Sequence, residues 1–477
     1  MMKQDKTPLY DALVGHIKKG PLSLHVPGHK NGLIYEDNSY FQKMLSIDVT
    51  ELTGLDDLHS PEGAILEAEK LLAEAYKVKR SFFLVNGSTV GNLAMMLAAL
   101  QEGDTVYIQR NSHKSILNGA MLTKAQPVLL GPEYHEEWGV AGSVSIETVR
   151  TAYREYPNCK AIILTYPNYY GMTYELEEII QFAHDNDIPV LVDEAHGAHF
   201  IGGEFFPRSA IELGADVVVQ SAHKTLPAMT MGSYLHVNSD YISSEMIHHY
   251  VRILQSSSPS YPIMASLDLA RKYIATYTRE DENYLRETIE EFRRELDKIN
   301  FLKVLTFPNE RGDPLKLTIQ TECSYTGYEL QRLFEEKGIF TEMADPYNVL
   351  LVLPLLKKDM YFPFEDIVSL IEEIKIPKQI RNHEPQYFTK KSISTLKRNH
   401  SYKERTIPLD ESVGYICAEN IIPYPPGVPF LLKGEEISKE DIQGLKILMK
   451  TGSKFQGGET LTAGMLTVFC KLEDNHD

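Results

Sequence analysis

The sequence predicts an α/β protein in which helices cover both faces of a mainly parallel sheet. Short apolar runs rich in β-branched residues alternate with helical segments from about residue 61 to residue 275, which is typical of parallel sheets. Polar side chains suited to chemistry directly follow several of these runs, at the sheet edge where open α/β folds bind their ligands. The strands are expected at residues 82–85, 105–108, 128–130, 161–166, 188–192 and 215–220.

With 477 residues the chain is longer than one hydrophobic core usually serves, so several domains are expected. A charged helix at residues 279–298 opens a later region of short strands, and a segment rich in Lys, Arg, Asn, Pro and Ser predicts a connector. The Pro-rich run 421–429 is unsuited to a regular helix. The expected divisions are an N-terminal arm (1–60), a large α/β domain (61–275), a small α+β domain (276–374), a linker (375–405) and a C-terminal domain (406–477).

Charge and composition exclude several classes of partner. The formal net charge of −18 disfavours nucleic acid and anionic membranes, because binding to phosphate groups needs a basic surface. Four scattered cysteines without a C-x-x-C pair predict neither a disulfide framework nor a metal site. The sequence shows no apolar signal core and no run of about 18 uncharged apolar residues. We therefore expect a cytoplasmic protein that binds neither nucleic acid, membrane nor metal.

The strongest chemical signal is a lysine placed opposite a carboxylate. Lys224 follows the apolar run 215–220, and Asp193 follows the run 188–192, so both are expected at the same edge of the sheet. A lysine that forms a Schiff base and an acid that pairs with a pyridinium nitrogen are the minimal protein contribution to pyridoxal 5′-phosphate (PLP) chemistry. Taken alone, the pattern S-x-H-K that ends at Lys224 more often marks a surface lysine after a strand. The assignment to PLP therefore needs further signals.

Two further stretches lie at predicted strand ends. Gly87, Ser88 and Thr89 form a turn between a strand and an Ala/Met/Leu-rich helix, where free N–H groups and the positive end of the helix dipole favour a phosphate. This signal is weak alone, because Ser or Thr at a helix start is usually an N-cap. After the next strand, His113 places an imidazole at the same edge, where an aromatic ring is able to cover a cofactor. A lone histidine is more often a packing residue.

Together these stretches resemble the ornithine/lysine/arginine decarboxylase family of fold-type I PLP enzymes, in its short form without the N-terminal receiver-like wing. The resemblance covers almost the whole chain, and the signatures occur in the family's order. One departure is Gly87-Ser88-Thr89, where relatives more often have Gly-Thr-Ser, and both orders supply two hydroxyls. The matching stretches are Pro27-Gly28-His29-Lys30, Leu55-Asp56-Asp57-Leu58-His59, Arg110-Asn111-Ser112-His113-Lys114-Ser115, Val192-Asp193-Glu194-Ala195-His196-Gly197, Ser221-Ala222-His223-Lys224 and Ser257-Ser258-Pro259-Ser260-Tyr261-Pro262.

The resemblance implies an aspartate aminotransferase-like fold and a role for each site residue. Lys224 is expected to hold PLP as a Schiff base and then to act as the general acid, with His223 as its competitor. Asp193 is expected to keep the pyridinium protonated, with Glu194 as the next candidate, and His113 to stack on the ring. His196 is expected at the ring or the substrate carboxylate. The phosphate is assigned to Gly87, Ser88, Thr89, Ser221 and His223.

The implied reaction is decarboxylation of arginine, lysine or ornithine to the corresponding amine, which would feed polyamine metabolism. Two alternatives remain open, namely a PLP-dependent aminotransferase or lyase on the same fold and a catalytically silent PLP-binding protein. The sequence does not rank the three substrates. The distal cation of the substrate needs a carboxylate partner, and the candidates are Glu51, Asp56 and Asp57, although helix capping explains this acidic cluster equally well.

The resemblance also implies a homodimer with shared sites, or a larger homo-oligomer built from dimers. The arm 1–60 is expected to pack on another subunit near the mouth of the active site. The hydroxyl of Ser256 is expected to reach the phosphate bound by the neighbouring subunit, and a C₂ dimer would then build both sites reciprocally. The alternative is an ordinary Ser-rich loop before Pro259.

Overall fold

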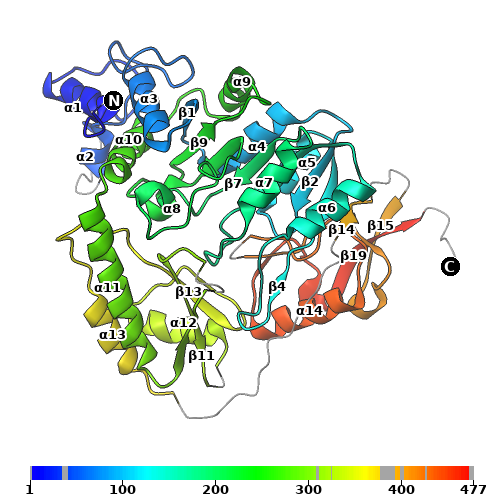
Figure 1. Ribbon diagram of the computed structural model, residues 1–477. Coiled ribbons are helices and arrows are strands. Elements are labelled where there is room, and N and C mark those ends of the chain that lie inside the picture. Colours follow the sequence, from blue (N-terminus) through cyan, green and yellow to red (C-terminus); the bar gives the residue numbers. More distant parts are fainter. Residues whose placement is uncertain are drawn as a thin grey trace. The chain divides into compact units, whose positions relative to one another are not determined.

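The computed structural model describes residues 3–34, 41–307, 311–323, 325–376, 393–397, 402–424 and 427–471. The chain forms two compact units (Figure 1). Unit 1 comprises residues 1–100, 176–285 and 355–359, and unit 2 comprises residues 101–175, 286–354 and 360–477. This grouping of contacts divides the segment 61–275 that was expected to be one domain, so the proposed domain boundaries stay a prediction.

Unit 1 contains four buried strands in the order β1 (Arg80–Leu84), β9 (Ser233–Val237), β8 (Val217–Gln220) and β7 (Val190–Asp193). Strands β7 and β8 are parallel, as the alternation of strands and helices predicts. Strand β9 was not predicted, and it runs antiparallel to both β8 and β1. The chain returns from β8 to β9 through residues 221–232, and the single turn of α8 in this connection is too short to be the crossover helix of a parallel connection.

Helix α4 (Gly87–Ala99) packs closely on this sheet because Gly91 faces it. A Cβ atom at Gly91 would lie 2.7 Å from a methyl group of Val219 and 2.8 Å from one of Leu84. The helix begins at Gly87, so Ser88 and Thr89 occupy its first turn rather than a separate turn before it. Helices α7 (Leu176–His184), α8 (Ala222–Thr225) and α9 (Ser244–Leu254) complete this part of unit 1.

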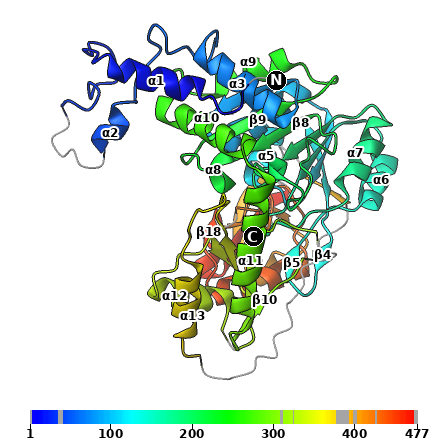
Figure 2. The same ribbon diagram turned by 60° about the vertical axis from the view of Figure 1, so that its left-hand side comes forward.

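The N-terminal segment is fastened to unit 1 by a buried ion pair. Helices α1 (Pro8–Lys18), α3 (Ala64–Tyr76) and α10 (Tyr261–Ala275) lie side by side (Figure 2). On α10, Asp268 accepts the N–H of Leu9, and Arg271 donates to the carbonyl oxygens of Gln4 and Lys6. Beyond α1 the chain exposes apolar side chains, and Leu24 is 96% exposed. Helix α2 (Phe41–Leu45) follows.

Unit 2 contains the parallel strands β6 (Cys159–Thr165), β2 (Thr105–Gln109) and β3 (Gln126–Leu130) in that order. Strand β14 (Ile393–Thr395) pairs antiparallel with β3. Helices α5 (Lys114–Leu122) and α6 (Ile146–Glu155) and the hairpin of β4 (Tyr134–His135) and β5 (Val140–Ala141) belong to the same unit.

A second, antiparallel sheet of unit 2 has the order β10 (Leu302–Val304), β11 (Lys316–Thr321), β13 (Asn348–Val352), β12 (Met343–Ala344). The short strands that were expected after the charged helix are therefore observed. The charged helix is observed as α11 (Arg279–Asp297), and α12 (Gly327–Glu336) and α13 (Phe364–Glu372) follow.

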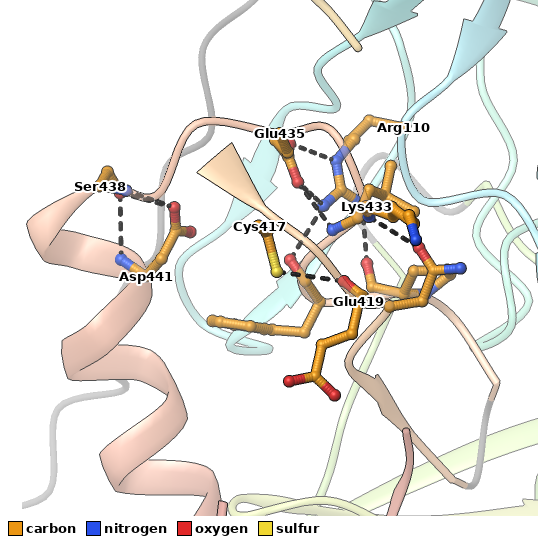
Figure 3. Close-up of polar contacts among 11 residues, drawn as sticks. Arg110, Cys417, Glu419, Lys433, Glu435, Ser438 and Asp441 are labelled. Carbon is orange, nitrogen blue, oxygen red and sulfur yellow. Dashed lines mark hydrogen bonds and ion pairs between the residues drawn. The ribbon is translucent and has the colours of Figure 1, made fainter. Parts of the chain in front are cut away.

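The C-terminal part has its own apolar core, which includes Leu431, Leu445 and Leu466. Strands β15 (Tyr402–Pro408), β19 (Met465–Lys471) and β16 (Ile416–Cys417) form one sheet, and β17 (Ile422–Pro423) pairs with β18 (Phe455–Gln456). Helix α14 (Lys439–Thr451) begins after the Pro-rich run, with Ser438 and Asp441 capping it reciprocally (Figure 3).

Only part of the expected linker 375–405 lies within the described residues, so the linker stays a prediction. This segment contains β14 and the first residues of β15, whereas residues 377–392 and 398–401 lie outside the described part. Within the described ranges, no helix is long and apolar enough to cross a membrane. Those same ranges hold no group of three or more His, Cys, Asp or Glu side chains that is able to bind a metal.

Candidate active site

Lys224 lies where the sequence places it, just beyond the carboxyl end of β8. Helix α8 begins at Ala222, directly after Ser221, and carries Lys224 in its single turn. Its Nζ atom lies 2.9 Å from Nε2 of His196, which follows the neighbouring parallel strand β7. The amine and the imidazole are therefore hydrogen-bonded at one edge of the sheet, the carboxyl ends of the parallel strands, where open α/β folds bind their ligands.

Asp193 ends β7, is buried and is held by two donors. Nδ2 of Asn92 lies 2.9 Å from its Oδ2, and the backbone N–H of Ala195 donates to its Oδ1 at 3.2 Å. The sequence analysis missed Asn92. A signal was present, because a polar residue in an apolar helix at position i+4 from Ser88 shares the face of that helix on which Ser88 lies.

The predicted phosphate seat brings together two segments of unit 1. Ser221, after β8, donates its hydroxyl hydrogen to the hydroxyl of Ser88 in the first turn of α4, with an O–O distance of 2.8 Å. Gly87 has a φ of +79°, and its N–H donates to the carbonyl oxygen of Met231. The positive φ favours glycine here. Thr89, in the same first turn, is exposed.

His223 has a fixed tautomer in this arrangement. Its backbone N–H and its Nδ1 both lie near the carbonyl oxygen of Gly232, at 3.1 Å and 3.0 Å. Because a carbonyl oxygen only accepts, Nδ1 carries a hydrogen. His223 therefore lies between the β8 end and the loop that leads into β9.

Glu194 has different hydrogen-bond partners from Asp193, and its place as the next candidate acid stays a prediction. Its carboxyl group accepts hydrogen bonds from the hydroxyl of Ser209, the N–H of Ala210 and Nε2 of Gln220. Burial raises the pKa of Glu194 to about 8 against these donors. Consecutive side chains point to opposite sides of a strand, so Glu194 faces away from Asp193 and into the protein.

Gln220, which donates to Glu194, also belongs to a chain of buried hydrogen bonds. Gln220 Oε1 lies 3.1 Å from Nε2 of His236 on β9, and Nδ1 of His236 lies 2.8 Å from the hydroxyl of Ser81 on β1. Burial lowers the pKa of His236 to about 3, so the imidazole is neutral. These hydrogen bonds link the three neighbouring strands β8, β9 and β1 of unit 1.

His113 belongs to unit 2, at the carboxyl end of β2. It is the N-cap residue of α5, where its Nδ1 accepts the N–H of Ser115 at 3.3 Å and lies 2.8 Å from the hydroxyl of Ser115. The histidine thus occupies the predicted strand end, and its stacking on a cofactor stays a prediction.

Asp56 serves as a structural cap. Its carboxylate accepts the backbone N–H groups of residues 57, 62, 63, 65 and 66 at the start of α3. Burial opposes its ionisation, but the backbone donors outweigh burial and lower the pKa of Asp56. Asp57 accepts the N–H of His59, and Glu51 accepts the hydroxyl of Thr50. The capping explanation is therefore correct for Asp56.

Ser256 is exposed, and its N–H donates to Oδ1 of Asn86 at 3.3 Å, directly before α4 of the same chain. Its carbonyl oxygen accepts from Nε2 of His59 at 2.7 Å. The loop of Ser256 therefore lies beside the helix start that was assigned to the phosphate. Its predicted contact with a neighbouring subunit stays a prediction.

The donor set of unit 1 fits PLP. A primary amine, a buried carboxylate and a helix N-terminus with two hydroxyls supply partners for the aldehyde, the pyridine nitrogen and the phosphate in turn. The amine follows β8 and the carboxylate ends the adjacent parallel strand β7, and α4 packs on β8 through Gly91.

Comparison with known proteins decides the family. The profile of the Orn/Lys/Arg decarboxylase major domain matches residues 7–311, and the profile of the C-terminal domain of the same family matches residues 378–471. The chain belongs to the Orn/Lys/Arg decarboxylase family. The predicted family, the predicted enzyme class and the expectation of PLP that rests on them are confirmed.

Relatives in this family align along nearly the whole chain. An uncharacterized protein YaaO of Bacillus subtilis is 46% identical, covering 98% of this chain and 99% of the relative. Arginine decarboxylase of Halalkalibacterium halodurans is 33% identical over 99% of each chain. The constitutive lysine decarboxylase of Escherichia coli is 24% identical, covering 95% of this chain and 79% of the relative.

Solved structures confirm the fold class. Lysine decarboxylase LdcF of Francisella novicida superposes with a TM-score of 0.79 at 20% identity, covering 98% of this chain and 81% of that one. Serine palmitoyltransferase of Sphingomonas wittichii has a TM-score of 0.51 at 19% identity, covering 64% of this chain and 74% of that one. The family's α/β fold with a mostly parallel central sheet is thus shared with these enzymes.

Proposed function

We propose that this chain decarboxylates L-arginine in preference to lysine and ornithine, using PLP bound through Lys224. The observation that carries the proposal is the 2.9 Å contact of Lys224 Nζ with His196, next to the buried and doubly held Asp193. The preference for arginine is supported by relatives named arginine decarboxylase, which are 30–33% identical, against 24% for the lysine decarboxylase of E. coli.

In the proposed mechanism, PLP supplies a conjugated ring that accepts the electron pair left when CO₂ departs. Asp193 holds the proton on the pyridine nitrogen, and Asn92 and Ala195 orient its carboxylate for this purpose. Ser88, Thr89, Ser221 and the N-terminus of α4 bind the phosphate.

Proton transfer is assigned to the residues around Lys224. Lys224 would hold the cofactor, and its Nζ would supply the proton to the substrate α-carbon, while His196, which is hydrogen-bonded to that Nζ, would orient it. His223 is the competing proton donor, although its Nδ1 hydrogen is held by the carbonyl oxygen of Gly232. Stacking over the cofactor ring is assigned to His113 by the resemblance to the family, and it stays part of the proposal.

Competition among substrates tests the proposed preference. The purified enzyme is incubated with equimolar arginine, lysine and ornithine, and the amine products are identified by mass spectrometry together with CO₂ release. The proposal predicts agmatine as the main product. Cadaverine or putrescine as the main product would reassign the substrate, and amino transfer without CO₂ would favour the alternative reaction on this fold.

We also propose that the enzyme works in the cytoplasm as a homodimer with shared sites, which supplies amines for polyamine metabolism. Exposed apolar side chains of the arm, including Leu22 at 90% exposure, support a subunit contact there. The variants Ser256→Glu and Lys224→Ala are each expected to be inactive. Co-refolded heterodimers should regain activity, because both lesions then fall in one site and the other site is intact. Inactive heterodimers would place Ser256 in the site of its own chain or outside the site.

A further inference from the structure

The turn that carries His113 is held by the C-terminal part of unit 2. Arg110, directly after β2, pairs with Glu435 through two hydrogen bonds, from Nε to Oε1 at 2.9 Å and from Nη2 to Oε2 at 2.7 Å (Figure 3). Both side chains are almost fully buried, with 5% and 8% of their surface exposed. A planar guanidinium that binds a carboxylate in this bidentate way has a fixed orientation.

The same guanidinium also binds the backbone of the C-terminal segment. Nη1 donates to the carbonyl oxygen of Pro429 at 2.7 Å, and Nη2 donates to that of Phe430 at 2.9 Å. Glu435 in turn accepts the N–H of Leu432 at 3.1 Å. Four hydrogen bonds from one side chain therefore fasten the loop 427–435 to the end of β2.

This fastened loop reaches His113. A Cβ atom at Gly427 would lie 3.6 Å from Cδ2 and Nε2 of the imidazole, so the loop backbone lies against one edge of the ring. The opposite edge is held at Nδ1 by Ser115. The next residue, Lys114, donates to Oε1 of Gln456 at 2.7 Å. The C-terminal part thus contacts the turn at three successive places.

We propose that Arg110 and Glu435 are positioning residues that clamp the C-terminal loop against His113 and fix the plane of its imidazole. This inference rests on the proposed function, because it gives the clamp the task of orienting the ring that covers the cofactor. It adds to that function a role for the C-terminal domain, which holds His113 in position.

A buried ion pair suits this task better than an apolar contact. Burying two charges costs desolvation energy, and replacing such a pair by apolar side chains is often neutral or stabilising. The pair fixes the orientation of the loop, because its hydrogen bonds are all satisfied in one arrangement of the loop only. A directional clamp is useful where an imidazole must be held in one plane.

The clamp is tested with Glu435→Gln and with the paired change Arg110→Met with Glu435→Leu. Removing one partner of a buried pair destabilises strongly, so the paired change, which leaves no buried charge, guards against misfolding. Glu404→Gln is the matched control, because Glu404 pairs with Lys433 in the same C-terminal part but at an exposed position. Each change is also made in a His113→Ala background.

Loss of the clamp should lower kcat by about 10-fold or more, because small misplacements of a positioned group are costly. In the His113→Ala background the same change should alter kcat by less than about two-fold, since coupled residues are not additive. Glu404→Gln should behave as wild type in both backgrounds. An equal loss of kcat with and without His113 would show a merely structural role and would overturn the proposal.

A second readout does not depend on activity. In the apoprotein, amide hydrogen exchange of residues 110–118 and 427–435 should be faster in the paired variant than in wild type, and unchanged in Glu404→Gln. Unchanged exchange at residues 110–118 would overturn the clamp itself. An enzyme that releases no CO₂ from any of the three amino acids would instead defeat the proposed function, so the two failures are distinguished.

Discussion

Two regions of the molecule carry the predicted chemistry, and they are supported in different ways. At the ends of β7 and β8, Asp193 is held by Ala195, two residues away, and by Asn92 of α4, the helix that packs on the same sheet, and Lys224 is held by His196, 28 residues away. At the end of β2, Arg110 is held by backbone and side-chain groups 319 to 325 residues away. The first site is built on neighbouring strands, whereas the second depends on a separate part of the chain.

This difference predicts that the two regions respond differently to mutation. Contacts between adjacent strands form with the sheet itself, so changes there act mainly on chemistry. Contacts between sequence-distant segments form only when both are folded. We expect variants of the Lys224 site to be folded and inactive, and variants of the Arg110 turn to lose order and activity together.

The largest effect is expected from Lys224→Ala, which removes the amine that binds the cofactor. The variant should lose the visible absorption of bound PLP and all measurable turnover, while its far-UV circular dichroism stays unchanged. Lys79→Ala, at an exposed lysine of unit 1, is the control and should keep both. A variant at residue 224 that retained the wild-type spectrum would remove the lysine from the account.

Asp193→Asn is expected to lower kcat by roughly 10²-fold or more with PLP still bound, because charge stabilisation at the ring nitrogen is lost. Asp216→Asn is a matched control. Asp216 is equally buried, but it precedes β8 and accepts the N–H of Val190 and the hydroxyl of Ser239. This control should lose stability and keep its kcat. A near-normal kcat in Asp193→Asn would place the electrostatic role elsewhere.

Asp56→Ala should reduce stability by about 1 kcal/mol, because the start of α3 loses its capping carboxylate. The KM for arginine should stay the same, which urea unfolding and steady-state kinetics check together. A higher KM at unchanged stability would return Asp56 to the substrate pocket. Glu51 and Asp57 keep their places as candidates for the distal cation.

A pH dependence of stability is expected at His236, whose folded-state pKa of about 3 lies well below its usual value because of burial. The unfolded chain binds a proton there that the folded protein does not, so stability is lost as pH falls from about 6.5 toward 3. The slope for one proton is at most about 1.4 kcal/mol per pH unit. His236→Gln should show a shallower decline in urea unfolding between pH 4.5 and 7. Parallel curves for the two proteins would contradict this.

Most of the parallel strands and the Lys224 site were predictable from sequence, because alternating patterns and strand-end residues are local signals. Strand β9 was not predicted. Its antiparallel direction depends on the connection from β8 and is not encoded in the composition of the strand. Asn92 was missed because its partner Asp193 lies 101 residues away. The ion pair of Arg110 with Glu435 was not predictable from local sequence, because each residue alone looks like an ordinary charged residue.

The central claim is that Lys224 holds the cofactor of a decarboxylase. Borohydride reduction of the purified enzyme, followed by protease digestion and mass spectrometry, locates the pyridoxyl group on the chain. The account predicts one modified peptide, with the group on Lys224, and loss of CO₂ release from arginine in proportion to its formation. A modified lysine elsewhere, or full activity after complete modification of Lys224, would contradict the account.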